Sequence, residues 1–213
     1  MLSTPGMKEA KSTNVVWQVG KVTKAERGAL LGQKGVTLWF TGLPASGKST
    51  LAIETERHLH DSGYLTYILD GDNIRHGLNS NLGFSPEDRN ENIRRIGEVS
   101  CLFSDAGVIV LTAFISPYRE DRDRVRSRHP EGGFIEVYVE CPLDVCEVRD
   151  PKGMYKRARA GQLPDFTGVS APYEAPLAPE ITVRTGESSI DECVSAILAC
   201  LVEAGIVSRD RVR

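Results

Sequence analysis

The 213-residue sequence lacks long apolar runs and a strong excess of either charge. No stretch approaches the roughly 18 apolar residues of a transmembrane helix, and residues 1–20 lack the apolar core of a signal peptide. The formal net charge is -3, so no overall basic field attracts nucleic acid. We therefore expect a cytoplasmic protein that binds neither membranes nor nucleic acids.

Cysteine and histidine are few, and none of them has the spacing of a metal centre. The five cysteines stand at positions 101, 141, 146, 193 and 200, and no two form a Cys-x-x-Cys pair. This odd, scattered set argues against a zinc or disulfide framework and predicts reduced core thiols. His58 and His60 lie in a polar stretch and are expected to face solvent.

Apolar strands and amphipathic helices alternate along the chain, which has 40% hydrophobic residues and can bury one full core. The expected strands cover residues 36–41, 64–69, 108–113, 134–139 and 181–184. The expected helices cover residues 23–33, 47–62, 118–128, 142–149 and 188–203. One more helix should begin at Pro86 behind an N-cap at Ser85, and Thr23 and Glu26 have the spacing of a capping box. Repeated strand–helix units predict a parallel sheet covered by helices on both faces, with the active site outside the carboxyl ends of the strands.

The segment GLPASGKS, residues 42–49, matches G-x-x-x-x-G-K-[ST] between an expected strand and an expected helix. Its glycines let backbone amides wrap a phosphate, Lys48 can reach the β- and γ-phosphates, and the Ser49 hydroxyl suits Mg²⁺. The alternative is a chance glycine-rich turn, which the strand-and-helix context disfavours. The fold class is therefore α/β, a P-loop NTPase-type three-layer αβα sandwich with a parallel sheet.

An acid follows the second expected strand in the segment LDGDNIR, residues 69–75. Asp72 could orient or deprotonate an attacking hydroxyl and hold Mg²⁺ through water. The alternative is an Asp or Asn turn that ends the strand. The third expected strand ends without Asp or Glu, so the usual Walker-B acid is missing there, and this weakens a GTPase or motor-ATPase interpretation.

Arginines next to this acid predict an anion site. Arg75 lies close by in sequence, and Arg89 and Asn92 stand one turn apart near a helix N-terminus, where free amides favour anions. Arginine forks suit sulfate or phosphate oxygens. The alternative is a solvated, charged helix face, to which we assign Arg94 and Arg95.

Two aromatic residues and a serine complete the candidate site. Phe84 and Phe166 stand in polar, glycine-containing segments and could sandwich a base, although each alone could be a packing anchor. Ser116 follows the third strand, where it could position a substrate, accept a phosphoryl group or simply cap a helix. Residues 150–178 are rich in Gly, Pro, Lys and Arg and predict a mobile lid that brings cations over the phosphates.

Together these segments resemble the adenylyl-sulfate kinase (APS kinase) family. The matching pieces, in family order, are GLPASGKST, DGDNIRHGLN, LGFSPEDRNENIRRIGEVS, FISPYREDRDRVR, RDPKGMYKRARAG and FTGVSAPYEAP. They lie between residues 35 and 207, which we take as the kinase domain. Residues 1–34 are then an N-terminal tail with a short helix, and residues 208–213 a C-terminal tail.

The resemblance implies a kinase that phosphorylates the 3′-hydroxyl of adenosine 5′-phosphosulfate with ATP and Mg²⁺. It implies a homodimer without a fused ATP sulfurylase region but with a functional link to that enzyme. The implied catalytic residues are Lys48, Asp72 and Ser116, the serine as a family phosphoserine position, and the implied metal ligands are Ser49 and Asp72. The implied ATP-binding residues are Gly42, Leu43, Pro44, Ala45, Ser46, Gly47, Lys48, Ser49, Thr50, Arg149, Ser188 and Cys193. The implied acceptor-binding residues are Asp72, Asn73, Arg75, Phe84, Arg89, Asn92, Ile115, Ser116, Lys152 and Phe166.

Two other functions compete with this one. The chain could be a kinase of the same fold that acts on a nucleoside monophosphate or gluconate. It could also be a catalytically silent nucleotide-binding module that regulates a sulfurylase, although the intact P-loop and Asp72 argue against that.

Overall fold

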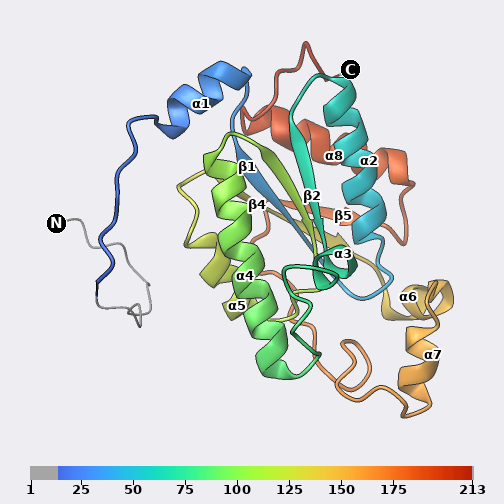
Figure 1. Cartoon of the computed structure of the whole chain (residues 1–213). Coiled ribbons are helices and arrows are strands. Elements are labelled where there is room, and N and C mark those ends of the chain that lie inside the picture. The colour runs from blue at the N-terminus through green and yellow to red at the C-terminus, as the bar shows by residue number, and fades with distance from the viewer. Residues whose placement is uncertain (1–13, 213) are drawn as a thin grey trace.

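The computed structural model describes residues 14–212, and in this range five parallel strands form one sheet (Figure 1). The strands are β1 (Val36–Thr41), β2 (Thr66–Asp70), β3 (Ile109–Ala113), β4 (Phe134–Glu140) and β5 (Ile181–Arg184). They lie in the order β2-β3-β1-β4-β5, and the central β1 pairs with β3 and β4. The carboxyl ends of all five strands therefore meet at one edge of the sheet.

Helices cover both faces of this sheet, which confirms the predicted αβα sandwich (Figure 1). On one face lie α2 (Lys48–Asp61) and α8 (Ile190–Glu203), and on the other lie α4 (Pro86–Asp105) and α5 (Arg119–Arg126). Side chains alternate across β1, so that Leu38 and Phe40 enter the first core and Trp39 enters the second.

Local capping sequences fix where several helices begin. Ser85 accepts a hydrogen bond from the backbone N–H of Asp88 at 3.1 Å and caps α4, whose first residue is Pro86. Thr23 and Glu26 form the predicted capping box at the start of α1 (Lys24–Leu31). These helix starts were predictable because each depends on residues within one turn.

The predicted lid contains a helix that the sequence interpretation missed. The helix α6 (Leu143–Arg149) leads into it, and α7 (Met154–Arg159) lies within it. Tyr155 and Phe166 pack in a small buried cluster with Cys141 and Cys146. The six-residue α7 buries only two side chains, which is too few to produce a visible apolar period. The five-residue α3 (Gly71–Arg75) was missed for the same reason, while the mobility of the lid remains a prediction.

The N-terminal tail is described only in part. Residues 14–20 form neither helix nor strand, and the apolar side chains of Val15, Val16, Trp17 and Val19 are exposed. Residues 1–13 of the predicted tail lie outside the described residues, and the domain boundaries remain predictions. Across residues 14–212, no helix combines the length and apolar character needed to cross a bilayer.

A buried histidine links α5 to the sheet and makes stability depend on pH. The Nδ1 of His129 lies 3.0 Å from the carbonyl oxygen of Val125, and its Nε2 lies 2.9 Å from the hydroxyl of Thr37. Because the Val125 carbonyl can only accept, Nδ1 carries the proton and Nε2 accepts from Thr37. Burial lowers the pKa of His129, and the hydrogen bond to Val125 offsets this only in part.

We predict that the protein loses stability as the pH falls below about 6.5, the usual histidine pKa. The unfolded chain then binds a proton that the folded His129 resists, so the free energy of unfolding falls by at most about 1.4 kcal/mol per pH unit for this group. Urea denaturation at pH 7 and pH 5 measures this loss, which should be smaller in His129→Gln. An equal loss in both proteins would contradict the prediction.

Candidate active site

The P-loop joins β1 to α2 and is shaped by close backbone contacts. A Cβ atom at Gly42 would stand 2.5 Å from the carbonyl oxygen of Val139, so this position has no room for a side chain. Gly47 adopts a left-handed φ of 97° directly before α2 begins at Lys48. The loop carbonyl of Pro44 accepts a hydrogen bond from the hydroxyl of Tyr155 in the lid at 3.0 Å.

Lys48 is a buried cation held by the loop itself. Its Nζ donates to the carbonyl oxygens of Gly42 at 3.0 Å and Leu43 at 2.6 Å. Burial lowers the pKa of Lys48 to about 8. The present partners of this ammonium are neutral carbonyl dipoles. A phosphate bound on the loop would give it a negatively charged partner.

An aspartate that the sequence interpretation did not include reaches the P-loop serine. The Ser49 hydroxyl donates to Oδ2 of Asp70 at 2.7 Å, and Asp70 is the last residue of β2. Its Oδ1 also accepts from the backbone N–H of Asp72 at 2.9 Å. A hydroxyl beside a carboxylate is a donor set that suits Mg²⁺. The signal that the sequence offers for it is an acid directly after the expected strand at residues 64–69.

Asp72 forms an ion pair with Lys152, so the structure brings together two residues that the sequence analysis had assigned to the site. Asp72 stands in the first turn of α3, while Lys152 lies in the lid just before α7. Both side chains are exposed, so each can exchange its partner for a substrate group. The metal pair predicted from the sequence, Ser49 with Asp72, remains a prediction.

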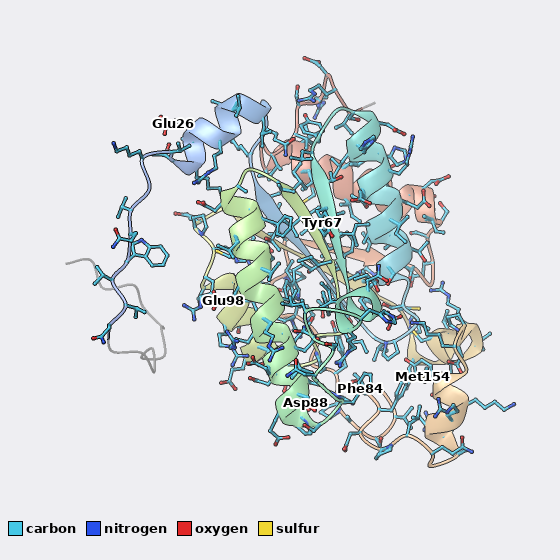
Figure 2. The ribbon with its side chains drawn as sticks, viewed as in Figure 1. Glu26, Tyr67, Phe84, Asp88, Glu98 and Met154 are labelled. Carbon is cyan, nitrogen blue, oxygen red and sulfur yellow. The ribbon has the colours of Figure 1, made fainter. Side chains whose placement is uncertain are left out.

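The predicted anion and base residues lie between α4 and the lid. The guanidinium of Arg75 stacks 4.2 Å above the ring of Phe84 and donates to the carbonyls of Leu82 and Gly83. Arg89 donates to the carbonyl of Asp165 in the lid at 2.6 Å. Figure 2 shows Phe84 near the end of α4 that lies towards the lid residue Met154.

Other predicted acceptor residues differ in their surroundings. Asn92 is buried and accepts a hydrogen bond from the side chain of Asn79 at 2.9 Å. Phe84 is 66% exposed, whereas Phe166 is buried and meets Tyr155 edge-on at 5.1 Å between ring centroids. The two rings therefore differ in exposure and in partners, and the sandwich of a base between them remains a prediction.

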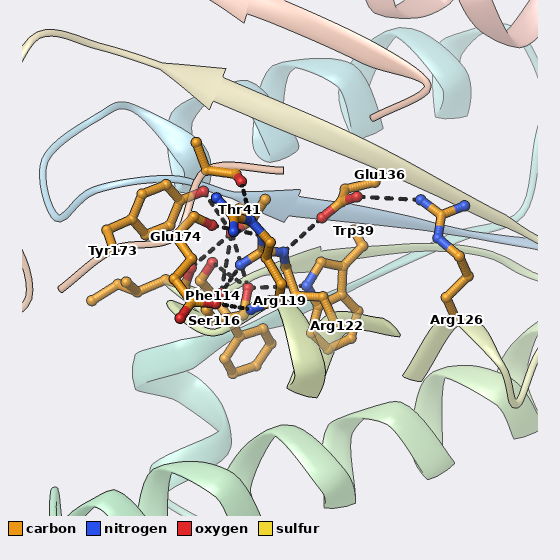
Figure 3. A network of polar contacts seen from close by, with 12 residues as sticks. Trp39, Thr41, Phe114, Ser116, Arg119, Arg122, Arg126, Glu136, Tyr173 and Glu174 are labelled. Carbon is orange, nitrogen blue, oxygen red and sulfur yellow. Dashed lines mark hydrogen bonds and ion pairs between the residues drawn. The ribbon is translucent and has the colours of Figure 1, made fainter. Parts of the chain in front are cut away.

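Ser116 is buried in a turn that follows β3 (Figure 3). Its Oγ accepts from the indole N–H of Trp39 at 3.0 Å and donates to the hydroxyl of Thr41 at 3.1 Å. Its φ of 40° is unusual for a residue other than glycine. These contacts favour a role in shaping the turn, which also presents Ile115.

The residues assigned to the nucleotide from α6 and α8 occupy distinct places. Arg149 donates to the carbonyl oxygen of Thr185, whose own hydroxyl donates to the P-loop carbonyl of Ser46 at 2.8 Å. Thr185 was not predicted, because nothing in the sequence shows that the end of β5 meets the P-loop. Ser188 is exposed before α8, while Cys193 is buried in the core, and their roles next to ATP remain predictions.

The family model for adenylylsulphate kinase matches residues 34–184. The chain belongs to this family. It is 61% identical over 188 residues to the adenylyl-sulfate kinase of Oceanobacillus iheyensis, covering 88% of this chain and 94% of that one. It is 57% identical to the adenylyl-sulfate kinase of Staphylococcus haemolyticus, covering 93% of this chain and 100% of that one.

Solved structures agree with this assignment. The APS kinase of Mycobacterium tuberculosis in complex with AMPPNP and APS superposes with a TM-score of 0.76 at 47% identity, covering 79% of this chain and 98% of that one. A gluconokinase from Sinorhizobium meliloti shares the fold, with a TM-score of 0.51 at 20% identity, 80% of this chain and 94% of that one being covered.

We predict that Asp70→Asn weakens the response of the protein to Mg²⁺. The neutral amide keeps the shape of the side chain but removes the charge beside Ser49, so the Mg²⁺ concentration that half-saturates ATP-dependent activity should rise at least about tenfold. A magnesium titration at fixed ATP measures this. Asp61→Asn is the matched control, because Asp61 is an exposed acid at the end of α2 that pairs with Arg57. An unchanged Mg²⁺ requirement in Asp70→Asn would contradict the prediction.

Proposed function

We propose that this protein transfers the γ-phosphate of ATP to the 3′-hydroxyl of adenosine 5′-phosphosulfate, giving 3′-phosphoadenylyl sulfate and ADP. The observation that carries the proposal is the convergence of two sites at one edge of the sheet. The P-loop with Lys48 and Ser49 stands at the end of β1, while Asp72 and the cluster of Arg75 and Phe84 follow β2. Relatives named adenylyl-sulfate kinase and the M. tuberculosis complex with AMPPNP and APS support this choice of substrates.

The donor side has the groups that a nucleotide triphosphate requires. The backbone N–H groups of residues 42–50, except Pro44, which has none, would hold the phosphates, and Lys48 would move from its two carbonyl partners to phosphate oxygens. Bound Mg²⁺ supplies charge neutralisation at the phosphates, and Ser49 and Asp70 are the side chains that would hold it. Arg149 binds the carbonyl of Thr185, whose hydroxyl binds the P-loop carbonyl of Ser46. Through these two hydrogen bonds Arg149 can hold the loop in place for the nucleotide.

The acceptor side would hold the phosphosulfate. Arg75 and Arg89 now donate to backbone carbonyls, and both can exchange these partners for sulfate or phosphate oxygens. Asp72 would release Lys152 and accept a hydrogen bond from the 3′-hydroxyl, which orients the oxygen towards the phosphorus. Lys152 would then be free to face the transferred phosphoryl group. Positioning and charge stabilisation account for most of the rate in such transfers.

Ser116 contributes to this scheme as a positioning residue. Its hydroxyl is buried and engaged with Trp39 and Thr41, so direct transfer between the two substrates needs no phosphoserine. The proposal also includes a homodimer, a functional link to ATP sulfurylase and a cytoplasmic location. Five free cysteines, which a reducing compartment maintains, support that location.

An acceptor panel tests the reaction itself. The purified protein is mixed with MgATP and, in separate reactions, adenosine phosphosulfate, a nucleoside monophosphate or gluconate, and ADP release is followed by a coupled assay. We expect turnover with adenosine phosphosulfate at least about a hundredfold above the other acceptors, since two arginines can bind two separate anionic groups and the other acceptors carry only one. Comparable turnover with gluconate, or no turnover at all, would refute the proposal.

A substitution at Asp72 tests the proposed mechanism. Asp72→Asn keeps the size of the side chain but removes its basicity, so kcat should fall about a hundredfold or more. The dissociation constant for ATP, measured by calorimetry, should change by less than about threefold because the P-loop is untouched. Asp61→Asn is the matched control, since Asp61 lies at the opposite end of α2 from the P-loop and pairs with Arg57. An unchanged kcat in Asp72→Asn would rule out this role.

A further inference from the structure

Arg122 of α5 is a buried cation that joins three separate segments (Figure 3). Only 2% of the residue is exposed. Its Nε donates to Oε1 of Glu136 on β4 at 2.7 Å, and its two terminal nitrogens donate to the carbonyls of Ser116 and Glu174, each at 2.7 Å. The carboxylate of Glu136 compensates the charge of the guanidinium in the core, and the rest of the fork is directed at two backbone segments.

The first of the two backbone segments that Arg122 binds is the turn after β3. Ser116 adopts a φ of 40°, a conformation that costs free energy in a residue with a Cβ atom. Such a turn persists only where its surroundings hold it. Arg122 binds the carbonyl of Ser116, and the hydroxyl of Thr41 donates to the neighbouring carbonyl of Ile115 at 2.8 Å. The turn is therefore held from α5 and from the end of β1.

The second segment is the end of the lid, where the chain returns to the sheet. The backbone N–H of Glu174 donates to the carbonyl of Pro117 at 2.8 Å, and its carboxylate accepts from the backbone N–H of Arg119, also at 2.8 Å. The hydroxyl of Tyr173 lies 3.0 Å from that of Thr41. Arg122 binds the carbonyl of Glu174 beneath these contacts, so one side chain holds both the turn and the lid end.

The same lid segment reaches the acceptor site. Phe166 stands shortly before Tyr173 in the chain, and the residues on either side of it, Asp165 and Thr167, both contact Arg89. A shift of the lid end would therefore displace Phe166 and the partners of Arg89 together. This segment also packs on Leu43 and Ala45 of the P-loop, but the polar contacts of Lys48 and Ser49 are made with other residues.

We propose that Arg122, with Glu136, is a positioning residue for the acceptor substrate. By binding the carbonyls of Ser116 and Glu174 at once, it fixes the turn after β3 against the end of the lid. The acceptor pocket is thereby set before substrate arrives, while the polar contacts of Lys48 and Ser49 on the nucleotide side do not depend on Arg122. This inference rests on the proposed function, since it assigns Arg122 to the acceptor of that reaction.

Arg126 provides a matched control on the same helix. It lies one turn after Arg122 and shares the partner Glu136, at 3.3 Å, while its main partner is Glu180. Its contacts with these two acids do not include the carbonyls of Ser116 or Glu174. A change at Arg126 therefore perturbs the ion pairs of α5 without touching the turn or the lid end.

The kinetic test compares Arg122→Lys with Arg126→Lys. Lysine keeps the positive charge but cannot bind Glu136 and both carbonyls through a fork. In Arg122→Lys we expect the KM for adenosine phosphosulfate to rise about ten- to a hundredfold and kcat to fall, with the KM for MgATP within about twofold. In Arg126→Lys all three constants should stay within about twofold. Equal rises for both substrates, or the same pattern in both variants, would overturn the inference.

A milder variant keeps the test valid if Arg122→Lys does not fold. Tyr173→Phe removes only the hydroxyl that meets Thr41 at the lid end, and it should raise the KM for the acceptor about two- to tenfold. Thermal unfolding of all variants shows whether each is folded at the assay temperature. An unchanged acceptor KM in folded Tyr173→Phe counts against a role for the lid end.

Limited proteolysis measures how accessible the lid is to a protease, and it does not depend on kinase activity. Trypsin can cut after Lys156, Arg157 and Arg159, which are exposed in or next to the lid helix α7. Faster lid cleavage in Arg122→Lys than in Arg126→Lys supports the inference, and equal rates overturn it. Wild-type protein that does not phosphorylate adenosine phosphosulfate would instead refute the proposed function, so the two failures are distinguishable.

Discussion

The parallel direction of all five strands is the constraint on which the site depends. Because the strands run the same way, their carboxyl ends meet at one edge, and residues far apart in sequence become neighbours there. The P-loop follows β1, Asp70 ends β2 and the turn of Ser116 follows β3. The hydrogen bond between Ser49 of α2 and Asp70 joins the segment after β1 to the end of β2, although β3 lies between these two strands in the sheet. A kinase needs a donor phosphate and an acceptor hydroxyl face to face, and this edge is where the fold can bring them together.

The cations at this edge are held mainly by backbone carbonyls. Lys48 donates to the carbonyls of Gly42 and Leu43, Arg75 to two carbonyls of the loop before α4, and Arg89 to one in the lid. Away from the edge, arginines such as Arg94 pair with carboxylates. A carbonyl dipole binds a cation less strongly than a carboxylate does. Replacing it by a phosphate or sulfate oxygen therefore gains free energy, which is what an anion site requires. Lys152 differs from these cations because its partner is a carboxylate, that of Asp72. When the pair separates, Asp72 can bind a hydroxyl and Lys152 can bind an anion.

The sequence predicted the parts of this arrangement that depend on nearby residues. Patterns of a few neighbouring residues are enough to predict the P-loop, the cap of α4 at Ser85 and the buried strands. The partners that come from different strands could not be predicted in this way. The bond between Ser49 and Asp70 depends on the order of the strands, and the bond between Thr185 and Ser46 depends on where β5 ends. The lid helix α7 was missed because two buried residues set no period. In the sequence Arg122 is one of four arginines in the segment REDRDRVR, and its burial beside Glu136 separates it from the other three.

The lid is attached to both halves of the site, and this explains why its two ends have such different chemistry. Its first end follows Arg149, which contacts Thr185 and through it the P-loop carbonyl of Ser46, on the nucleotide side. Its second end is held at Glu174 by Arg122 and the turn after β3, on the acceptor side. A lid fixed at only one end could close over one substrate whether or not the other substrate is bound. Each end of the lid is therefore held by a different part of the site, one on the nucleotide side and one on the acceptor side. Water is best excluded when both substrates are in place, and a lid held at both sites meets that condition.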